Sequence, residues 1–180
     1  FTLGWSAILI RLADAPPLAI AAYRMLGGAA LLLPVAGPAL WALWRGLGPR
    51  SRTIWAASAL FLTLHFALWI ESLRHTSVAS STVLVTTNPI FAGIGGWLFL
   101  GEIEKRRFWS GVALTAAGGA WLAWSDAGAW SGSPLGNALA LGGAVLASGY
   151  LICGRMLRGH IPLLPYVAGC YGLSGILLAG

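Results

Sequence analysis

Charged residues are scarce in this chain. Only 9% of its 180 residues are Asp, Glu, Lys or Arg, whereas apolar residues make up 58%. A soluble domain has roughly a quarter charged residues, so this chain has too little polarity to cover a soluble fold of its length. Apolar stretches near the roughly 20 residues that cross a bilayer recur instead. The composition therefore predicts an all-α membrane protein, a helical bundle with several spans in a lipid bilayer.

Cysteine and acidic residues are also few, and their positions argue against catalysis. Cys153 and Cys170 fall inside apolar segments, where we expect them to serve packing, and both aspartates, Asp14 and Asp126, fall in loops. We find no nucleophile with a partner His and acid, no cluster with metal-ligand spacing and no Gly-rich phosphate loop. We therefore expect neither an enzyme nor a metal or other cofactor.

The hydropathy pattern divides the chain into seven predicted spans. The chain opens on Phe1 rather than Met and stops at Gly180 inside an apolar run, so we expect a fragment of a longer protein. The first and last spans are accordingly incomplete. The predicted spans are Phe1–Ala13, Pro17–Leu43, Thr53–Leu73, Val78–Leu100, Phe108–Ser125, Leu135–Cys153 and a seventh from about Pro162.

The connections between these spans alternate in charge. Connections 44–52, 101–107 and 154–161 hold eight of the eleven Lys and Arg residues, and the others hold only Arg74. By the positive-inside rule the even-numbered connections are cytoplasmic. The net charge of +6 thus reflects topology, and we expect no nucleic-acid partner.

Small residues recur at helical spacing in two of the spans. Such faces let helices approach closely in lipid. We therefore expect close packing at two stripes, formed by Gly111, Thr115 and Gly119 and by Gly136, Ala140 and Ala144.

A weak internal repeat appears when the chain is shifted by 145 residues. Seven identities fall in the 35 overlapping positions, Pro17 on Pro162 and Gly27 on Gly172 among them. The sixth span then corresponds to the first, which makes the repeat unit five spans long. An odd number of spans inverts the second unit, an architecture common in secondary transporters.

Several segments resemble the EamA domain of the drug/metabolite transporter superfamily. The central one is 64–102, "LHFALWIESLRHTSVASSTVLVTTNPIFAGIGGWLFLGE". The segment "PPLAIAAYR" is similar to the second span of that family, and "GNALALGGAVLASGYLICGRMLR" to the start of a second repeat. The resemblance implies a ten-span transporter built from two inverted five-helix repeats. Residues 1–126 would hold the first repeat, without the start of its first span, and residues 135–180 the start of the second.

Polar residues at mid-membrane depth are candidates for a substrate site. At about 1.5 Å per residue, His65 and Asn88 both lie near the middle of the bilayer. His65 shares a helix face with Trp69, and its imidazole can donate to a substrate, take a coupling proton or form an interhelical hydrogen bond without a role in transport. Asn88 and Pro89 mark a helix break that either exposes backbone to substrate or is a packing kink satisfied by Thr86 or a neighbouring helix.

Three further residues complete the predicted substrate-binding set. Arg24 lies about 10 Å below the outer surface, where a charge costs a few kcal/mol on insertion scales. It can pair with a substrate carboxylate, snorkel to the headgroups or bond to carbonyls of a neighbouring helix. Trp5 and Tyr150 coincide in the repeat, so their rings can stack on a substrate from both halves or simply pack against lipid and neighbouring helices.

The remaining acidic residues lie at helix ends. We expect Glu71 to pair with Arg74 at the outer end of the third span. Glu102 and Glu104 are expected to form a solvated charge cluster with residues 105–107 at the cytoplasmic edge.

Together these patterns predict a secondary transporter of small organic metabolites in the cytoplasmic membrane. It would work by alternating access, with export as the favoured direction. Uptake by the same fold and a non-transporting membrane scaffold are the alternatives. The expected partners are the lipid bilayer and a small-molecule substrate, and a homodimer is one assembly that the pattern allows.

Overall fold

The computed structural model describes residues 8–10, 12, 13, 15–125 and 133–180, and this described part contains helices and no strand. Each predicted span that falls in it is helical, and most bounds differ from the prediction by four residues or fewer. The elements are α2 (Pro17–Gly46), α3 (Pro49–His75), α4 (Val78–Val85), α5 (Asn88–Gly95), the π-helical turn η1 (Gly96–Leu100), α6 (Arg106–Ser125), α7 (Pro134–Leu157) and α8 (Leu163–Ala179).

Four of the described helical segments are long and apolar enough to cross a membrane. They are α2, α3, the segment Val78–Leu100 and α7. The apolar helix α8 is shorter, with 17 residues, and α6 occupies the predicted fifth span without being among the four. The prediction of an all-α membrane protein with several spans is confirmed.

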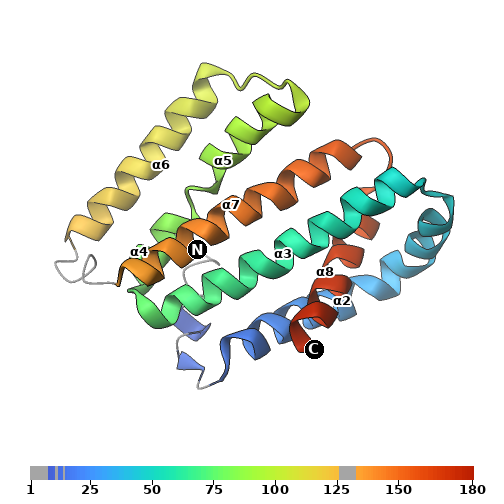
Figure 1. Cartoon of the computed structure of the whole chain (residues 1–180), viewed down its shortest axis with the longest axis horizontal. Helices are drawn as coiled ribbons and strands as arrows, with labels where there is room; N and C mark the ends of the chain where they lie inside the picture. Colours follow the sequence, from blue (N-terminus) through green and yellow to red (C-terminus); the bar gives the residue numbers. More distant parts are fainter. Residues whose placement is uncertain (1–7, 11, 14, 126–132) are drawn as a thin grey trace.

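Helices α3 and α7 run side by side through the middle of the molecule (Figure 1). Glycines of α7 allow the close approach. A Cβ on Gly136 would lie 2.8 Å from the backbone of His75, and one on Gly143 would lie 3.4 Å from the Cβ of Trp69. A Cβ on Gly149 would lie 3.0 Å from the Phe61 ring. The approach is therefore tightest at Gly136, where a Cβ would collide with the α3 backbone, whereas one at Gly143 would make an ordinary contact.

Helices α2 and α8 form the second close pair, on the opposite flank from α6 (Figure 1). A Cβ on Gly28 of α2 would lie 2.7 Å from the Tyr171 ring of α8. A Cβ on Gly175 of α8 would lie 2.6 Å from the Leu26 side chain. The 145-residue shift aligns α2 with α8. The two helices that correspond in the weak internal repeat therefore pack against each other.

The fourth span is interrupted halfway. Helix α4 ends at Val85, and α5 begins at Asn88 after a turn at Thr86 and Thr87. The Thr86 hydroxyl donates to the carbonyl of Val83 at 2.8 Å. Pro89 has no N–H to donate to the carbonyl of Val85, and the Thr87 hydroxyl bonds, like that of Thr86, to a carbonyl earlier in α4, that of Leu84, at 2.6 Å.

The predicted connections meet in two groups at opposite ends of the bundle. At one end, Arg155 of α7 bonds to Glu102 in the connection between η1 and α6, at 2.9 Å. At the other end, the N–H of Ser133 donates to the carbonyl of His75 at 3.0 Å. The basic connections 101–107 and 154–161 therefore lie at the same end, as their alternating charge requires (Figure 1).

Candidate functional site

Arg24 on α2 lies over two aromatic rings of α3. Its guanidinium carbon lies 5.4 Å from the ring centre of Phe66 and 5.7 Å from that of Trp69. The His65 and Trp69 rings are nearly parallel, at an angle of 8°, with centres 6.0 Å apart. Cations over aromatic faces are stabilised by the ring quadrupole, most strongly where water is excluded. We call Arg24, His65, Phe66, Trp69 and Tyr171 the Arg24 cluster.

The cluster draws on four helices. Besides α2 and α3, helix α7 supplies the Gly143 carbonyl, which lies 2.8 Å from Nδ1 of His65. Helix α8 carries Tyr171, whose ring lies against Gly28 of α2, one helical turn from Arg24. A Cβ on Gly143 would lie 3.5 Å from the His65 carbonyl, an ordinary contact distance, so α3 and α7 are closely packed at this level.

The hydrogen bond to Gly143 fixes the role of each imidazole nitrogen in the neutral ring. A carbonyl oxygen only accepts, so Nδ1 must carry the proton. Nε2 then presents a lone pair and acts as an acceptor. The cluster thus combines a permanent positive charge, an acceptor nitrogen and three further aromatic rings.

Asn88 does not join this cluster through any contact that the structure gives. Its backbone carbonyl accepts a hydrogen bond of 2.7 Å from the hydroxyl of Ser148 on α7. Ser148 follows Gly143 by five residues, so the break in the fourth span and His65 attach to the same helix. The break thus contacts a neighbouring helix, and both readings of it, exposure of backbone to substrate and a packing kink, stay predictions.

Tyr150 belongs to a separate buried polar group between α3, α7 and α8. Its ring stacks on that of Tyr166, with centres 5.8 Å apart. The Ser58 and Tyr166 hydroxyls bond to each other, and that of Tyr166 also donates to the Tyr150 carbonyl at 3.2 Å. The Sγ of Cys170 lies 3.8 Å from the Ser58 hydroxyl, which agrees with the packing role expected for this cysteine.

Trp5, the predicted counterpart of Tyr150, lies outside the described residues. The prediction that the two rings stack on one substrate therefore stays a prediction.

The sequence did not predict the roles of Phe66, Tyr171 and Tyr166. The position of Phe66 beside His65 was the one available signal, because the two tyrosines come from a helix whose packing partner the sequence does not specify.

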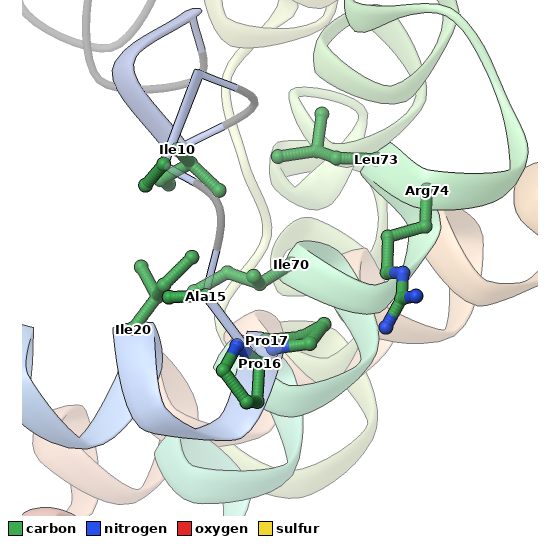
Figure 2. A pocket seen from close by; sticks show the side chains of 9 residues that line it. Ile10, Ala15, Pro16, Pro17, Ile20, Ile70, Leu73 and Arg74 are labelled. Carbon is green, nitrogen blue, oxygen red and sulfur yellow. The ribbon is translucent and has the colours of Figure 1, made fainter.

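A cavity of about 540 Å³ opens near the end of α3, away from the predicted substrate residues. Ile20, Ile70, Leu73 and Arg74 line it together with the chain that leads into α2, and Figure 2 shows Arg74 extending toward Pro17. Ile20 is one helical turn from Arg24 on α2, and Leu73 is one turn from Trp69 on α3. The cavity thus lies about one turn from the Arg24 cluster, toward the end where the weakly charged connections meet.

The structure corrects the ion pair expected for Glu71 and adds a partner for Glu102 and Glu104. Glu71 pairs with His75 at 2.9 Å, because His75 lies one turn further along α3, whereas the Arg74 side chain extends to the cavity. Glu102 and Glu104 bond to Arg155 at 2.9 and 3.4 Å. Arg155 reaches them because α7 crosses the backbone of Gly96, and the sequence alone does not show this crossing.

Comparison with known proteins agrees with the fold and adds the family. Several apolar helices around buried polar groups define a polytopic helical membrane protein. The chain belongs to the EamA-like transporter family, whose model matches residues 1–124. The resemblance seen in the sequence is thereby confirmed.

Three curated relatives are uncharacterized transporters. YwfM of Bacillus subtilis is 30% identical over 172 residues, which cover 92% of this chain and 55% of that protein. YvbV of the same organism is 31% identical over 146 residues, or 79% of this chain and 46% of that protein. A transporter of Archaeoglobus fulgidus is 30% identical over 116 residues, or 62% of this chain and 37% of that protein. The chain spans about half the length of these relatives, and no solved structure matches it.

Proposed function

We propose that the protein is a secondary transporter that exports small organic metabolites across the cytoplasmic membrane by alternating access. The observation that carries this proposal is the Arg24 cluster. A half-buried guanidinium and aromatic rings lie together where helices α2, α3, α7 and α8 pack. Ionisable groups inside membrane helices are costly and mark substrate pathways by default.

The helices that build the cluster come from both parts of the proposed inverted repeat. Arg24 and Trp69 belong to the first unit, and Gly143 and Tyr171 to the second. In transporters of this architecture the substrate lies between the repeats near the bilayer midplane. The contact between the corresponding helices α2 and α8 supports the same arrangement.

The cavity one turn from the Arg24 cluster supports a substrate pathway that opens toward the outer face of the membrane. Its volume of about 540 Å³ falls within the range of small-molecule sites. Because it lies about one turn from Arg24 and Trp69, a solute released from the cluster would enter it next. The basic connections at the opposite end fit a cytoplasmic location by the positive-inside rule.

Transport would be tested with the full-length protein. A metabolite-resistance screen in overexpressing cells would identify a substrate, and flux would be followed in proteoliposomes. His65→Ala and Trp69→Ala are expected to reduce flux at least tenfold at equal expression, with Trp121→Phe on the exposed face of α6 as the control. Unchanged flux in both variants would contradict this site, and vesicles of known orientation would separate export from uptake.

A scaffold without transport makes the opposite prediction about water access. Cysteine at residue 65 should react with a polar thiol reagent from at least one side of the membrane if the cluster lines a pathway. Cys153 and Cys170 are buried and give a low background. A residue 65 that no reagent reaches from either side would favour the scaffold.

A further inference from the structure

A groove of about 340 Å³ separates α6 from the broken fourth span, on the flank where Figure 1 shows α6 beside α4 and α5. The two spans touch at both ends of this groove. A Cβ on Gly93 of α5 would lie 2.9 Å from the Phe108 ring of α6. A Cβ on Gly119 of α6 would lie 2.8 Å from the Val83 side chain of α4. Between these contacts a Cβ on Gly111 would have no described neighbour within 4 Å, so the middle of the groove is open.

The walls of the groove are largely apolar, although three threonines belong to them. The hydroxyls of Thr86 and Thr87 donate to carbonyls of α4 at 2.8 and 2.6 Å, and that of Thr115 donates within α6 at 2.9 Å. Each of these hydroxyl protons is therefore already used. Hydrophobic side chains such as that of Ile90 line the rest, and Arg107 alone among the described lining residues is charged. A polar ligand would lose hydrogen bonds to water along such walls, so the groove favours an apolar one.

The length of the groove matches one leaflet of a bilayer. It follows α6 from Arg107 to Ala116, which is about 14 Å along a helix. Half of the hydrocarbon core of a bilayer measures about 15 Å. Leu114 and Trp121 on the same helix are both 76% exposed, and such large apolar side chains are stable against lipid. The groove therefore has the length and the surroundings of a site for one acyl chain.

The end of the groove at Arg107 is positively charged. Residues 105–107 are two arginines and a lysine, and all three are exposed. The neighbouring carboxylates of Glu102 and Glu104 bond instead to Arg155, at 2.9 and 3.4 Å. Within the described part of the chain no carboxylate forms an ion pair with residues 105–107. These charges can therefore attract an anion at the membrane surface, where each Lys or Arg strengthens binding about fivefold.

We propose that the groove between α6 and the fourth span binds one anionic phospholipid from the leaflet at the basic end of the bundle. Its phosphate bonds to Arg107, and residues 105–107 together select a net negative head group over a zwitterionic one. One acyl chain follows Ile90 and fills the open space at Gly111. In the orientation proposed above this is the cytoplasmic leaflet. The inference goes beyond transport, because it concerns a membrane lipid and holds whichever solute is moved.

Photo-crosslinking of the full-length protein in lipid nanodiscs would test the site. The probe is phosphatidylglycerol with a diazirine in one acyl chain, and the comparison probe is phosphatidylcholine with the same chain. Mass spectrometry locates the labelled residues. We expect the anionic probe to label the groove about tenfold more than the zwitterionic one. Glycerophosphoglycerol has the same head group without acyl chains, and it should not compete. Competition by this soluble ester would mean that the site binds a free phosphate ester, which would overturn the proposal.

Two variants separate the chain from the head group. Gly111→Leu fills the groove and should lower labelling by phosphatidylglycerol about tenfold, as if roughly two methylenes were withdrawn from it. Gly118→Leu is the matched control, because a Cβ there also has no described neighbour within 4 Å and Gly118 does not line the groove. Arg107→Gln should lower the preference for phosphatidylglycerol about fivefold, whereas the exposed Arg50→Gln at the same end should not. Since Arg107→Gln leaves the helix packing intact, it tests the proposal even if the leucine variant does not fold.

Three outcomes would overturn the proposal. Equal labelling by the two probes would refute the selection of an anionic head group. Labelling that Gly111→Leu leaves unchanged would place the chain outside the groove. Labelling confined to other surfaces would mean that another part of the protein or a second copy covers this one. None of these measurements involves flux, so the transport function stands or falls separately.

Discussion

Helices α6 and α7 carry similar stripes of small residues, yet they pack very differently. The stripe of α7 is buried, with Ala140 and Ala144 fully inaccessible and Gly136 against the backbone of α3. The stripe of α6 is largely open, because a Cβ on Gly111 would have no neighbour within 4 Å. Only Gly119 meets another helix, at the Val83 side chain.

The difference lies in the polar contacts that accompany the small residues. Helix α7 is also fixed by the hydrogen bond from Thr76 to Asn137 at 2.9 Å, by that between His65 and Gly143, and by Arg155. The polar bonds given for the α6 side chains, from Ser110 and Thr115, go to its own backbone. Small residues permit close approach in lipid, and directional bonds decide where it happens.

The largest expected effect comes from a methyl group at the tightest point of α7. Gly136→Ala would place a Cβ 2.8 Å from the His75 backbone, which cannot move aside like a flexible side chain. Overpacking of this kind should lower the free energy of unfolding by about 2 kcal/mol. SDS-induced unfolding of the full-length protein would measure it. Gly111→Ala on α6 is the control, and equal destabilisation by both would remove the contrast between the helices.

The next effect concerns the hydroxyl that joins α7 to the broken fourth span. Ser148→Ala removes the hydrogen bond that joins α7 to the Asn88 carbonyl and should cost about 1 kcal/mol. Ser110→Ala on α6 removes only a bond to its own helix and should stay within about 0.5 kcal/mol. The same unfolding assay compares them, and a neutral Ser148→Ala would show that this contact is dispensable.

A smaller effect is expected at the end of α7 where the basic connections meet. Arg155→Gln breaks both bonds to Glu102 and Glu104 and should cost about 0.5–1 kcal/mol, since such partly exposed pairs contribute little. The exposed Arg158→Gln serves as the control. High salt should shrink the difference between wild type and Arg155→Gln. A salt-independent difference would mean that packing over Gly96, rather than charge, holds this end.

The smallest prediction separates the two ends of the α6 stripe. Gly111→Ala should stabilise by about 0.5–1 kcal/mol, because alanine favours the helix and the site is open. Gly119→Ala gains the same preference but meets Val83 at 2.8 Å, so the two effects should nearly cancel. In a Val83→Ala background Gly119→Ala should stabilise like Gly111→Ala. If it does not, something other than Val83 limits this position.

Much of the fold could be predicted from hydropathy alone. The bounds of the fourth span agreed with the structure at both ends, because each helix must carry its own run of apolar residues and end where turn residues begin. The small-residue stripes were equally visible, but only one is buried. A stripe of small residues shows which face of a helix allows close packing. It does not show which other helix packs against that face.

The candidate site divides in the same way. Arg24, His65 and Trp69 were identified from depth and helical phase, and the structure brings them together with Phe66. Asn88 and Tyr150 were chosen by the same reasoning and face other contacts. Depth predicts only the position of a residue along the membrane normal, and helical phase predicts only which residues of the same helix share its face. Neither predicts which side chains of different helices meet.

The sequence by itself determined that the chain is helical, that it lies in a membrane and that its connections alternate in charge, because the cost of burying polar backbone and charge in lipid acts on each segment separately. Only the tertiary structure decided that the Gly143 carbonyl meets His65, that Arg155 bonds to Glu102 and that no described residue accepts from the Trp69 N–H. These facts depend on how helices distant in sequence pack against one another, and in lipid that packing is set by shape and a few directional bonds rather than by hydropathy.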